Sequence, residues 1–412
     1  MASSVTPPRG MRDFLPADKR RRDLILDRIR STYRSFGFDE IETPVAEESD
    51  RLHAGLGGDN EKLAFAIMKR GITPEKLAAA SEPLELADLG LRFDLTVPLA
   101  RFYATHRATL PGVFRAIQIA PVWRAERPQK GRYRQFVQCD IDIIGEPGPM
   151  AEIELLSATS AVLNGLGLAG TTIRINDRRI LVALLSHWGV PADRFDHALV
   201  IVDKLDKVGV DGVVTELASI GVPVDGLAEA LGELSGATWE SVVGADWLDA
   251  AAFADLVSLR DALPGARLEF DPTLVRGMGY YTGTIFEVAH PDFGYSLGGG
   301  GRYDGMIGRF LGVDVPAAGF SLGFERLVDL VELSGGASGD GVVLLYDAGA
   351  EPAALVRLQH ELAADGTRVR LDRKAKNLKN QLAGLKEQGF ASFATVSDST
   401  ATAADLSFRS LS

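Results

Sequence analysis

Two stretches with the composition of β-strands, residues 114–126 and 135–145, stand on either side of a short basic segment. The second, QFVQCDIDIIG, alternates polar Gln138, Asp140 and Asp142 with mainly apolar neighbours. Successive side chains of a strand point to opposite faces, so this alternation predicts a β-hairpin with one polar face. We therefore expect the fold to present that face of the hairpin to a site.

The segment that joins the two strands, WRAERPQKGRYRQF, carries five basic residues and one acid, Glu126. Arginine binds phosphate oxygens bidentately and keeps its charge, and an aromatic ring such as Phe136 can stack on a base. The segment therefore suggests a nucleotide or nucleic-acid contact. The alternative is a solvated, charged hairpin tip. The net charge of −12 argues against indiscriminate nucleic-acid binding but allows a local basic surface.

The composition limits the other classes of function. One cysteine, Cys139, excludes an intrachain disulfide, and the six histidines have no metal-binding spacing, so we expect no metal held by the protein alone. No apolar run approaches the roughly 20 residues of a membrane helix, and the N-terminus lacks the apolar core of a signal peptide. These features favour a cytoplasmic protein without membrane contact.

The length of 412 residues predicts two or three domains. An amphipathic helix within residues 18–38 opens a discontinuous main domain, 1–184 and 263–332, which holds all the candidate site residues. Residues 185–262 have short helical patterns and are expected to form an inserted helical domain. The small residues of 333–340 predict a linker, and 341–412 a small domain with a βαβ rhythm.

Arg276 lies in the segment LVRGMGYYTG, which we interpret as an apolar strand context with Gly277 and Gly279 allowing close ligand approach. A buried arginine is costly unless it meets an anion or a carboxylate. Either a ligand contact or a structural salt bridge fits this segment.

Two glycine-containing segments follow. SLGGGGRYDG matches neither a Walker A loop nor a dinucleotide fingerprint, so a plain glycine-rich turn is the simplest interpretation. In GFSLGFERL, Arg326 stands at the predicted junction of a strand and a helix. There it can meet a terminal phosphate, or it can be an ordinary arginine on a helix surface.

Asp94 and Thr96 are two residues apart in LRFDLTVPLARF, and we expect them on the same face of a strand. In that position they can hold an ammonium group. The alternative is a capping pair ahead of Pro98.

Taken in order, these segments resemble the class II aminoacyl-tRNA synthetases, and specifically the histidyl-tRNA synthetase family. GFDEIETP is similar to the family's dimer-interface motif, VWRAERPQKGRYRQF to its second motif and GFSLGFERL to its third. LVRGMGYYTG and GGGRYDG are similar to segments peculiar to the histidine enzymes. The resemblance runs over nearly the whole chain, from PPRGMRDFLP to the tail.

The resemblance implies an α+β fold, with an antiparallel six-stranded sheet flanked by helices, a helical insertion and a C-terminal α/β anticodon-binding domain. It implies a homodimer that uses ATP with Mg²⁺, activates L-histidine to histidyl-adenylate and transfers it to histidine tRNA. Adenylate formation brings two anions together, which arginine and Mg²⁺ must neutralise, and it requires no protein nucleophile.

The resemblance also implies residue roles. The catalytic residues are Arg276, Arg124 and Gln138. Histidine is held by Asp94, Thr96, Gln138, Asp142, Tyr281 and Tyr303. ATP is held by Arg124, Glu126, Arg132, Phe136 and Arg326, and the tRNA acceptor end meets Arg127, Gln129, Lys130 and Arg134. An imidazole needs both an acceptor and a donor at its two nitrogens, and an aspartate with a tyrosine meets that need.

The chain departs from the family pattern at several positions. Gly279 stands where many members have aspartate, and Asp94 and Asp142 replace glutamates of many bacterial members. The tail after residue 390 is shorter and more polar than the family's usual ending, which bears on anticodon contact.

Three other functions compete with the synthetase reading. A related regulatory subunit binds histidine and activates ATP phosphoribosyltransferase, but such paralogues generally lose the arginine at Arg276, the basic loop and the tail domain, all of which this chain keeps. A synthetase duplicate attached to another pathway would have the same site. A pure nucleic-acid-binding module would leave Asp94, Asp142 and Arg276 unexplained.

Overall fold

A computed structural model describes residues 5–53, 63–129, 131–276, 279–332, 341–397 and 399–411. The chain divides into two compact units, Met1–Arg12 with Leu26–Val331, and Asp13–Ile25 with Glu332–Ser412. The helix α1 (Pro16–Ser35), predicted from its amphipathic pattern, is shared between them. The expected linker at 333–340 lies outside the described residues.

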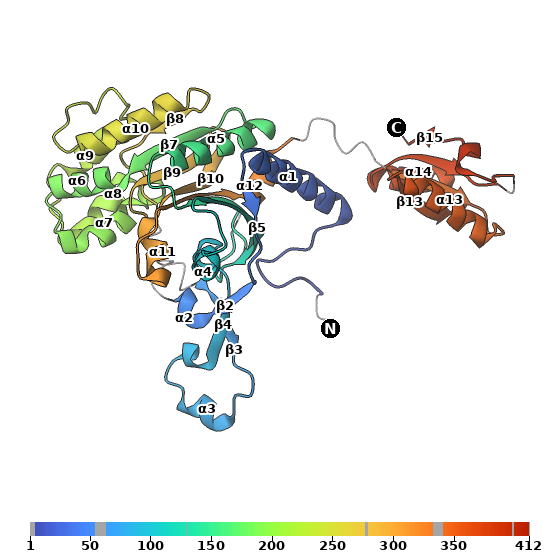
Figure 1. The fold of residues 1–412 in the computed structure, drawn as a ribbon, viewed down its shortest axis with the longest axis horizontal. Coiled ribbons are helices and arrows are strands. Elements are labelled where there is room, and N and C mark those ends of the chain that lie inside the picture. The colour runs from blue at the N-terminus through green and yellow to red at the C-terminus, as the bar shows by residue number, and fades with distance from the viewer. Residues whose placement is uncertain are drawn as a thin grey trace. The chain divides into compact units, whose positions relative to one another are not determined.

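The first unit is built on one large sheet (Figure 1). Six consecutive neighbours in it pair antiparallel, which confirms the expected sheet. In spatial order they are β5 (Phe114–Trp123), β6 (Gln135–Ile144), β11 (Ala317–Gly323), β10 (Phe293–Arg302), β9 (Thr284–His290) and β7 (Thr172–Asp177). Two short edge strands, β1 (Asp39–Glu40) and β8 (Leu268–Phe270), add to it in parallel, so the sheet has eight strands where six were predicted.

The predicted hairpin is confirmed, because β5 and β6 pair along ten residues each. The alternation of polar and apolar residues in β6 gives this part of the sheet two different faces. Cys139, Ile141 and Ile143 are fully buried on the face covered by α5 (Met150–Gly165) and α12 (Phe324–Leu330). The even-numbered polar side chains point to the other face.

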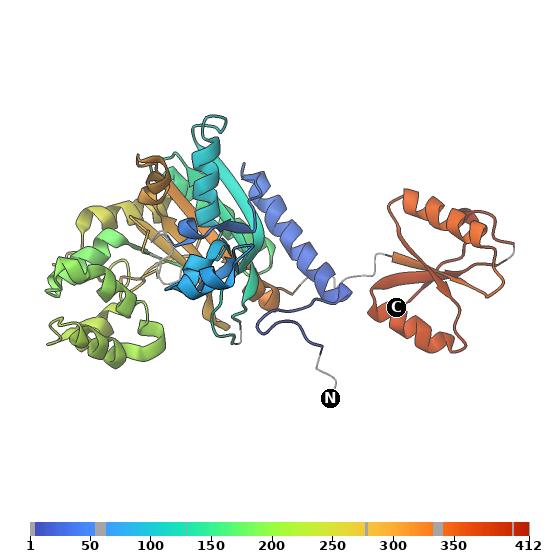
Figure 2. The ribbon, with the colours of Figure 1, turned by 90° about the horizontal axis from the view of Figure 1, so that it is seen from below.

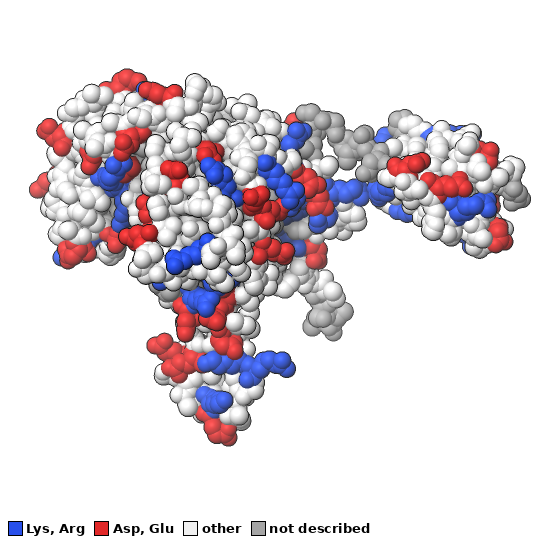
Figure 3. All heavy atoms as spheres, viewed as in Figure 1, with Lys and Arg blue, Asp and Glu red and all other residues white. Residues whose placement is uncertain are grey.

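Near the polar face lie α4 (Thr96–His106) and α11 (Asp304–Leu311), which pack together. A small lobe projects beyond them (Figure 1). It contains a second sheet in the order β2 (Ala46–Glu48), β4 (Ala87–Leu91), β3 (Phe65–Met68), with α2 (Ser49–Leu52), α3 (Pro74–Ala79) and the 3-10 turn η2 (Pro83–Leu86). Figure 3 shows side chains of both charge signs on this lobe.

The chain between β7 and β8 is helical. Asp177 caps α6 (Arg178–His187) by accepting a hydrogen bond from the backbone N–H of Arg179, and Asp249 caps α10 (Ala250–Ala262) in the same way. Between them lie η3 (Ala192–Arg194), α7 (Phe195–Val202), α8 (Leu205–Ser219) and α9 (Leu227–Leu234). The helical segment therefore enters and leaves the sheet next to β7.

The second unit contains a four-stranded sheet in the order β13 (Arg368–Arg373), β12 (Gly341–Tyr346), β14 (Phe390–Thr395), β15 (Arg409–Ser410). The first three strands are parallel, as the βαβ rhythm predicts, and β15 is antiparallel. Helices α13 (Pro352–Ala364) and α14 (Leu378–Glu387) cover opposite faces (Figure 2). A 3-10 turn, η4 (Ala403–Asp405), precedes β15. None of the helices in the described parts of the chain is long and apolar enough to cross a membrane.

Candidate active site

The sheet register brings polar residues of distant segments into one row. Glu287 on β9 pairs with Gly299 on β10, which pairs with Ser321 on β11, then Asp140 on β6 and Gln118 on β5. Directly opposite residues share a face, so this row crosses the polar face of the sheet. The neighbouring rows hold Asp142 opposite Gly319 and Gln138 opposite Gly323.

Asp142 and a group of tyrosines form one end of the site. The Tyr303 hydroxyl donates a 2.6 Å hydrogen bond to Asp142 Oδ1, and both residues are buried. Burial raises the pKa of the Asp142 carboxyl to about 7, although the bond from Tyr303 opposes the rise. The Tyr280 ring lies 4.8 Å from that of Tyr281 and 5.9 Å from that of Tyr303. A carboxylate acceptor and hydroxyl donors thus meet in one buried corner.

Asp94 and Thr96 are not on a strand, so that prediction was wrong. Asp94 follows β4 and Thr96 is the first residue of α4. Asp94 Oδ1 accepts a 3.2 Å hydrogen bond from the Val97 N–H in the first turn of α4, which resembles the capping alternative although Leu95 is the N-cap. The charge of Asp94 also raises the pKa values of Asp140 and Asp142. Asp94 is therefore close enough to act on the carboxyls of the polar face.

Gln138 is buried and linked to the neighbouring strand. Its Nε2 donates a 2.9 Å hydrogen bond to Ser321 Oγ, while its Oε1 is buried without a partner among the described residues. An unpaired buried acceptor is costly unless a ligand donates to it. Gln138 therefore presents an acceptor to the site.

Arg276 lies in an irregular segment rather than a strand, which corrects that interpretation. Its Nη1 donates a 2.7 Å hydrogen bond to Glu287 Oε2, and Glu287 also pairs with Arg174 of β7. A Cβ on Gly299 would stand 2.7 Å from the Arg276 Cζ, so only glycine lets the guanidinium lie on the strand. The glycine run belongs to β10, so the prediction of a glycine-rich turn was wrong. Gly277 lies outside the described residues.

Arg124 directly follows β5 at the other side of the site. Its Nε donates a 2.9 Å hydrogen bond to the Phe93 carbonyl, and its guanidinium lies 5.1 Å from the centre of the Phe136 ring. Arg132 and Glu126 pair at 3.4 Å in the adjoining loop. Burial lowers the pKa of Arg124, and the charges of Asp94 and Glu126 oppose that effect.

Arg326 stands at the junction of β11 and α12, as predicted. Its Nη1 donates a hydrogen bond to the Ser296 carbonyl. Burial lowers the pKa of Arg326, and the positive charges of Arg132 and Arg276 lower it further. Three arginines from separate segments therefore repel one another here, and a bound anion would relieve that repulsion.

The loop between β5 and β6 contains the residues predicted to meet the tRNA. Arg127 and Gln129 are exposed, and Gln129 exchanges two backbone hydrogen bonds with Arg132. Arg134 is half-buried, and its Nε donates a 3.0 Å hydrogen bond to the Glu126 carbonyl. Lys130 lies outside the described residues.

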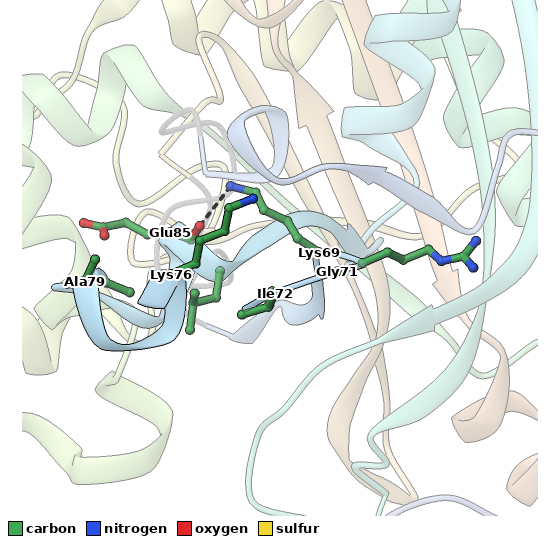
Figure 4. Close-up of a pocket in the computed structure, with 9 residues that line it drawn as sticks. Lys69, Gly71, Ile72, Lys76, Ala79 and Glu85 are labelled. Atoms are coloured by element: carbon green, nitrogen blue, oxygen red, sulfur yellow. Dashed lines mark hydrogen bonds between the residues drawn. The ribbon is translucent and has the colours of Figure 1, made fainter. Parts of the chain in front are cut away.

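Two cavities lie away from these residues. One of about 330 Å³ on the small lobe is lined by Lys69, Lys76 and Glu85, and the Lys69 ammonium donates to the Glu85 carbonyl at 2.9 Å (Figure 4). Another of about 370 Å³ lies beside Arg178 and Thr282. Neither cavity contains a predicted site residue, so the candidate site rests on the polar face of the sheet.

Three residues of the polar face were not given a role from the sequence. Asp140, Ser321 and Glu287 are each bonded to a predicted site residue or placed directly beside one. The alternation in β6 marks Asp140 as a polar-face residue. The contacts of Ser321 with Gln138 and of Glu287 with Arg276 depend on strand register, and the sequence contains no comparable pattern that marks them.

Comparisons with known proteins agree with this fold. The family model described as histidyl-tRNA synthetase matches residues 10–327. The histidine–tRNA ligase of Leifsonia xyli subsp. xyli is 59% identical, with 98% of this chain and 99% of that protein covered. The crystal structure of histidyl-tRNA synthetase from Nostoc sp. PCC 7120 superposes with a TM-score of 0.77 at 24% identity, covering 99% and 95% of the two chains.

A structure from Bacillus halodurans C, described as an ATP phosphoribosyltransferase regulatory subunit/histidyl-tRNA synthetase, is also similar in fold. Its TM-score is 0.75 at 22% identity, covering 93% of this chain and 97% of that one. At this identity the likeness concerns the fold alone.

The antiparallel sheet, its flanking helices and the arginine-lined polar face define a class II aminoacyl-tRNA synthetase, an ATP-using ligase. The family match and the 59% identical relative further show that the chain belongs to the histidyl-tRNA synthetase family. They do not favour the regulatory-subunit alternative.

Proposed function

We propose that the polar face of the sheet activates L-histidine with ATP and then transfers the histidyl group to histidine tRNA. The observation that carries this proposal is the juxtaposition of two environments on one face. Buried carboxylates and tyrosines surround Asp142, and mutually repelling arginines gather around Arg326. The first suits a cationic amino acid with a ring that can both donate and accept, and the second suits a polyphosphate.

In this proposal the amino acid lies over β6. Asp94, Thr96 and Gln138 hold its α-ammonium group, supported by the buried, unpartnered Oε1 of Gln138. Asp142 and Tyr281 bind the two imidazole nitrogens, and Tyr303 closes the pocket while holding Asp142 through its 2.6 Å hydrogen bond.

ATP lies on the arginine side. Arg124 and Arg326 bind its phosphates, Glu126 and Arg132 line the nucleotide, and adenine stacks on Phe136, beside which Arg124 already lies. Arg276 stands between the two substrates. Its Nη1 is bonded to Glu287 and its buried Nε has no partner among the described residues, so that N–H is available to the substrates.

The reaction then needs no protein nucleophile. A histidine carboxylate oxygen forms a bond to the α-phosphorus, the bond from that phosphorus to the bridging oxygen breaks, and pyrophosphate leaves with its electron pair. Arg276 and Arg124 stabilise the charge on the α-phosphoryl oxygens, while Gln138 orients the attacking group. The tRNA terminal ribose hydroxyl next attacks the histidyl carbonyl and releases AMP.

Mg²⁺ enters with ATP in this scheme. It commonly binds through substrate phosphates, water and one or two carboxylates. The described residues contain no group of three or more His, Cys, Asp or Glu side chains suited to a metal, and Glu126 is the carboxylate beside the proposed nucleotide. Mg²⁺ would neutralise the leaving pyrophosphate.

The exposed loop between β5 and β6 is proposed to reach the tRNA acceptor end through Arg127, Gln129, Lys130 and Arg134. The α/β unit from residue 341 is proposed to meet the anticodon, with 1–184 and 263–332 as catalytic domain and 185–262 as insertion. We also propose a cytoplasmic homodimer, on the resemblance of GFDEIETP to the dimer motif and on the single cysteine. Light scattering of the purified chain tests the dimer.

The test of function is histidine-dependent ATP–pyrophosphate exchange, followed by charging of histidine tRNA. Wild-type protein is expected to do both. Histidine binding without exchange would overturn the enzyme assignment. A chain ending at residue 332 should retain exchange while losing most charging, whereas equal loss of both would show that the tail supports the catalytic unit.

A further inference from the structure

The proposed function leaves one buried carboxylate on the polar face without a task. Asp140 is 4% exposed and lies between Gln138 and Asp142 on β6. Across the sheet it faces Ser321 on one side and Gln118 on the other. Its Oδ1 has no hydrogen-bond partner among the described residues. A charge so placed is expensive unless it acts on something.

Asp140 is joined to Gln138 through Ser321. The Gln138 Nε2 donates hydrogen bonds to Ser321 Oγ at 2.9 Å and to Asp140 Oδ2 at 3.5 Å. Ser321 lies directly opposite Asp140 on the neighbouring strand, where its hydroxyl lowers the pKa of the Asp140 carboxyl. An ionised carboxylate only accepts, so we assign the single hydroxyl hydrogen of Ser321 to the ionised Asp140. The Ser321 oxygen must then accept from Gln138.

This chain of bonds decides which way the Gln138 amide points. An amide side chain has a donating and an accepting end, and its partners determine which end faces where. With Nε2 turned to Ser321, Oε1 faces the opposite way, buried and unpartnered. A flipped amide would present N–H groups to an arriving ammonium cation and repel it.

The charged neighbours make the ionised form of Asp140 depend on a bound cation. Burial, together with the charges of Asp142 and Asp94, raises the pKa of Asp140 well above its usual range, while Arg124 and the Ser321 bond lower it. A cation bound beside Gln138 would favour the ionised, accepting form of Asp140. A bound ammonium group and the contacts that join Asp140, Ser321 and Gln138 (the relay) therefore stabilise each other.

We propose that Asp140 is a positioning residue, which acts through Ser321 to hold Gln138 Oε1 toward the α-ammonium group of the amino acid. The inference rests on the proposed function, in which Gln138 binds that group. It adds two residues, Asp140 and Ser321, to the machinery that selects an amino acid over its des-amino analogue.

The experiment measures dissociation constants of L-histidine and of 3-(imidazol-4-yl)propionate, which lacks the amino group. Calorimetry on the full chain compares wild type, Asp140→Asn, Ser321→Ala, Gln138→Ala and the double variant Asp140→Asn/Gln138→Ala. Asp140→Asn and Ser321→Ala should each weaken histidine binding about tenfold, the worth of about one hydrogen bond, and change binding of the analogue less than about twofold. In exchange assays KM for histidine should rise while kcat stays within about twofold.

The double variant separates the relay from a direct charge effect. If Asp140 acts through Gln138, Asp140→Asn costs nothing further once Gln138 is alanine. A full additional loss in that background would overturn the relay, and so would equal weakening of both ligands. Ser321→Ala keeps the Asp140 charge, so an unchanged histidine affinity in that variant would also refute it. Wild-type protein that binds no histidine would instead refute the proposed function.

Discussion

The two faces of β6 are almost equally buried, yet they differ in chemistry. Cys139, Ile141 and Ile143 are fully covered by helices on one face, while Asp140 and Asp142 are only 4% exposed on the other. The apolar face stabilises the fold through burial. The polar face costs free energy, visible in the raised pKa values of both aspartates. One face of β6 therefore provides side chains that can bind a ligand, and the other face stabilises the fold.

The largest expected contrast compares two partly buried arginines from opposite faces. Arg276 is paired with Glu287 on the polar face, and Arg302 of β10 is paired with Glu152 of α5 on the helix-covered face. Arg276→Ala should lower kcat/KM for histidine in pyrophosphate exchange by about 10³-fold or more, because it removes stabilisation of the α-phosphoryl charge. Its melting temperature should change little, because Glu287 keeps its ion pair with Arg174.

Arg302→Ala is the matched control for that variant. Breaking this partly buried pair should cost about 3 kcal/mol of unfolding free energy, with exchange per folded molecule largely kept. Exchange that survives Arg276→Ala would contradict the role given to that arginine.

The next contrast lies on the apolar face. Ile141→Ala removes a fully buried side chain opposite Phe320 and Ile117 and should cost about 2–5 kcal/mol of stability. Chemical denaturation measures this loss. KM for histidine should stay within about twofold at low temperature, and a large KM change would mean that the two faces are mechanically coupled.

The third prediction concerns pH. The folded pKa of Asp142 is about 7 against an ordinary 3.8, so the native state keeps a proton that the unfolded chain releases. Stability should therefore fall as pH rises from about 4 to about 7 and then level off. Asp142→Asn should flatten this profile, with a difference on the order of 4 kcal/mol above pH 7, while it weakens histidine binding. Identical pH profiles for the two proteins would contradict the assigned shift.

The smallest effect is expected from two glycines on opposite faces. A Cβ on Gly319 would stand 2.0 Å from Asp142 Oδ1, so Gly319→Ala should displace that carboxylate and raise KM for histidine about tenfold. A Cβ on Gly300 would meet the Gly319 carbonyl oxygen at 2.0 Å, so Gly300→Ala should lower the melting temperature. Similar KM values for Gly319→Ala and wild type would contradict the placement of Asp142.

Much of this arrangement was predictable where local pattern decides it. The alternation in β6 predicted the hairpin and its polar face, and the strand–helix junction at Arg326 was correctly placed. The motif order also identified the family.

Other features depended on contacts across the chain. Asp94 was placed on a strand because Asp, Thr and Pro occur both in caps and at strand ends, and only the bond from the Val97 N–H separates the two. The glycines of β10 suggested a turn, because the contacts that require them, such as Arg276 over Gly299 and the Gly319 carbonyl against Gly300, come from distant parts of the chain. Ser321 meets Gln138 through strand register, which no local pattern encodes.

The strand order has a consequence for synthesis on the ribosome. β6 ends at Ile144, but its sheet neighbour β11 begins only at Ala317, roughly 170 residues later, or on the order of 10–30 s of translation. During that interval one long edge of the hairpin has no native partner, and unpaired strand edges promote aggregation. Nascent chains should therefore depend on chaperones until β11 emerges, and slowed elongation through the helical segment should lower the yield of folded protein.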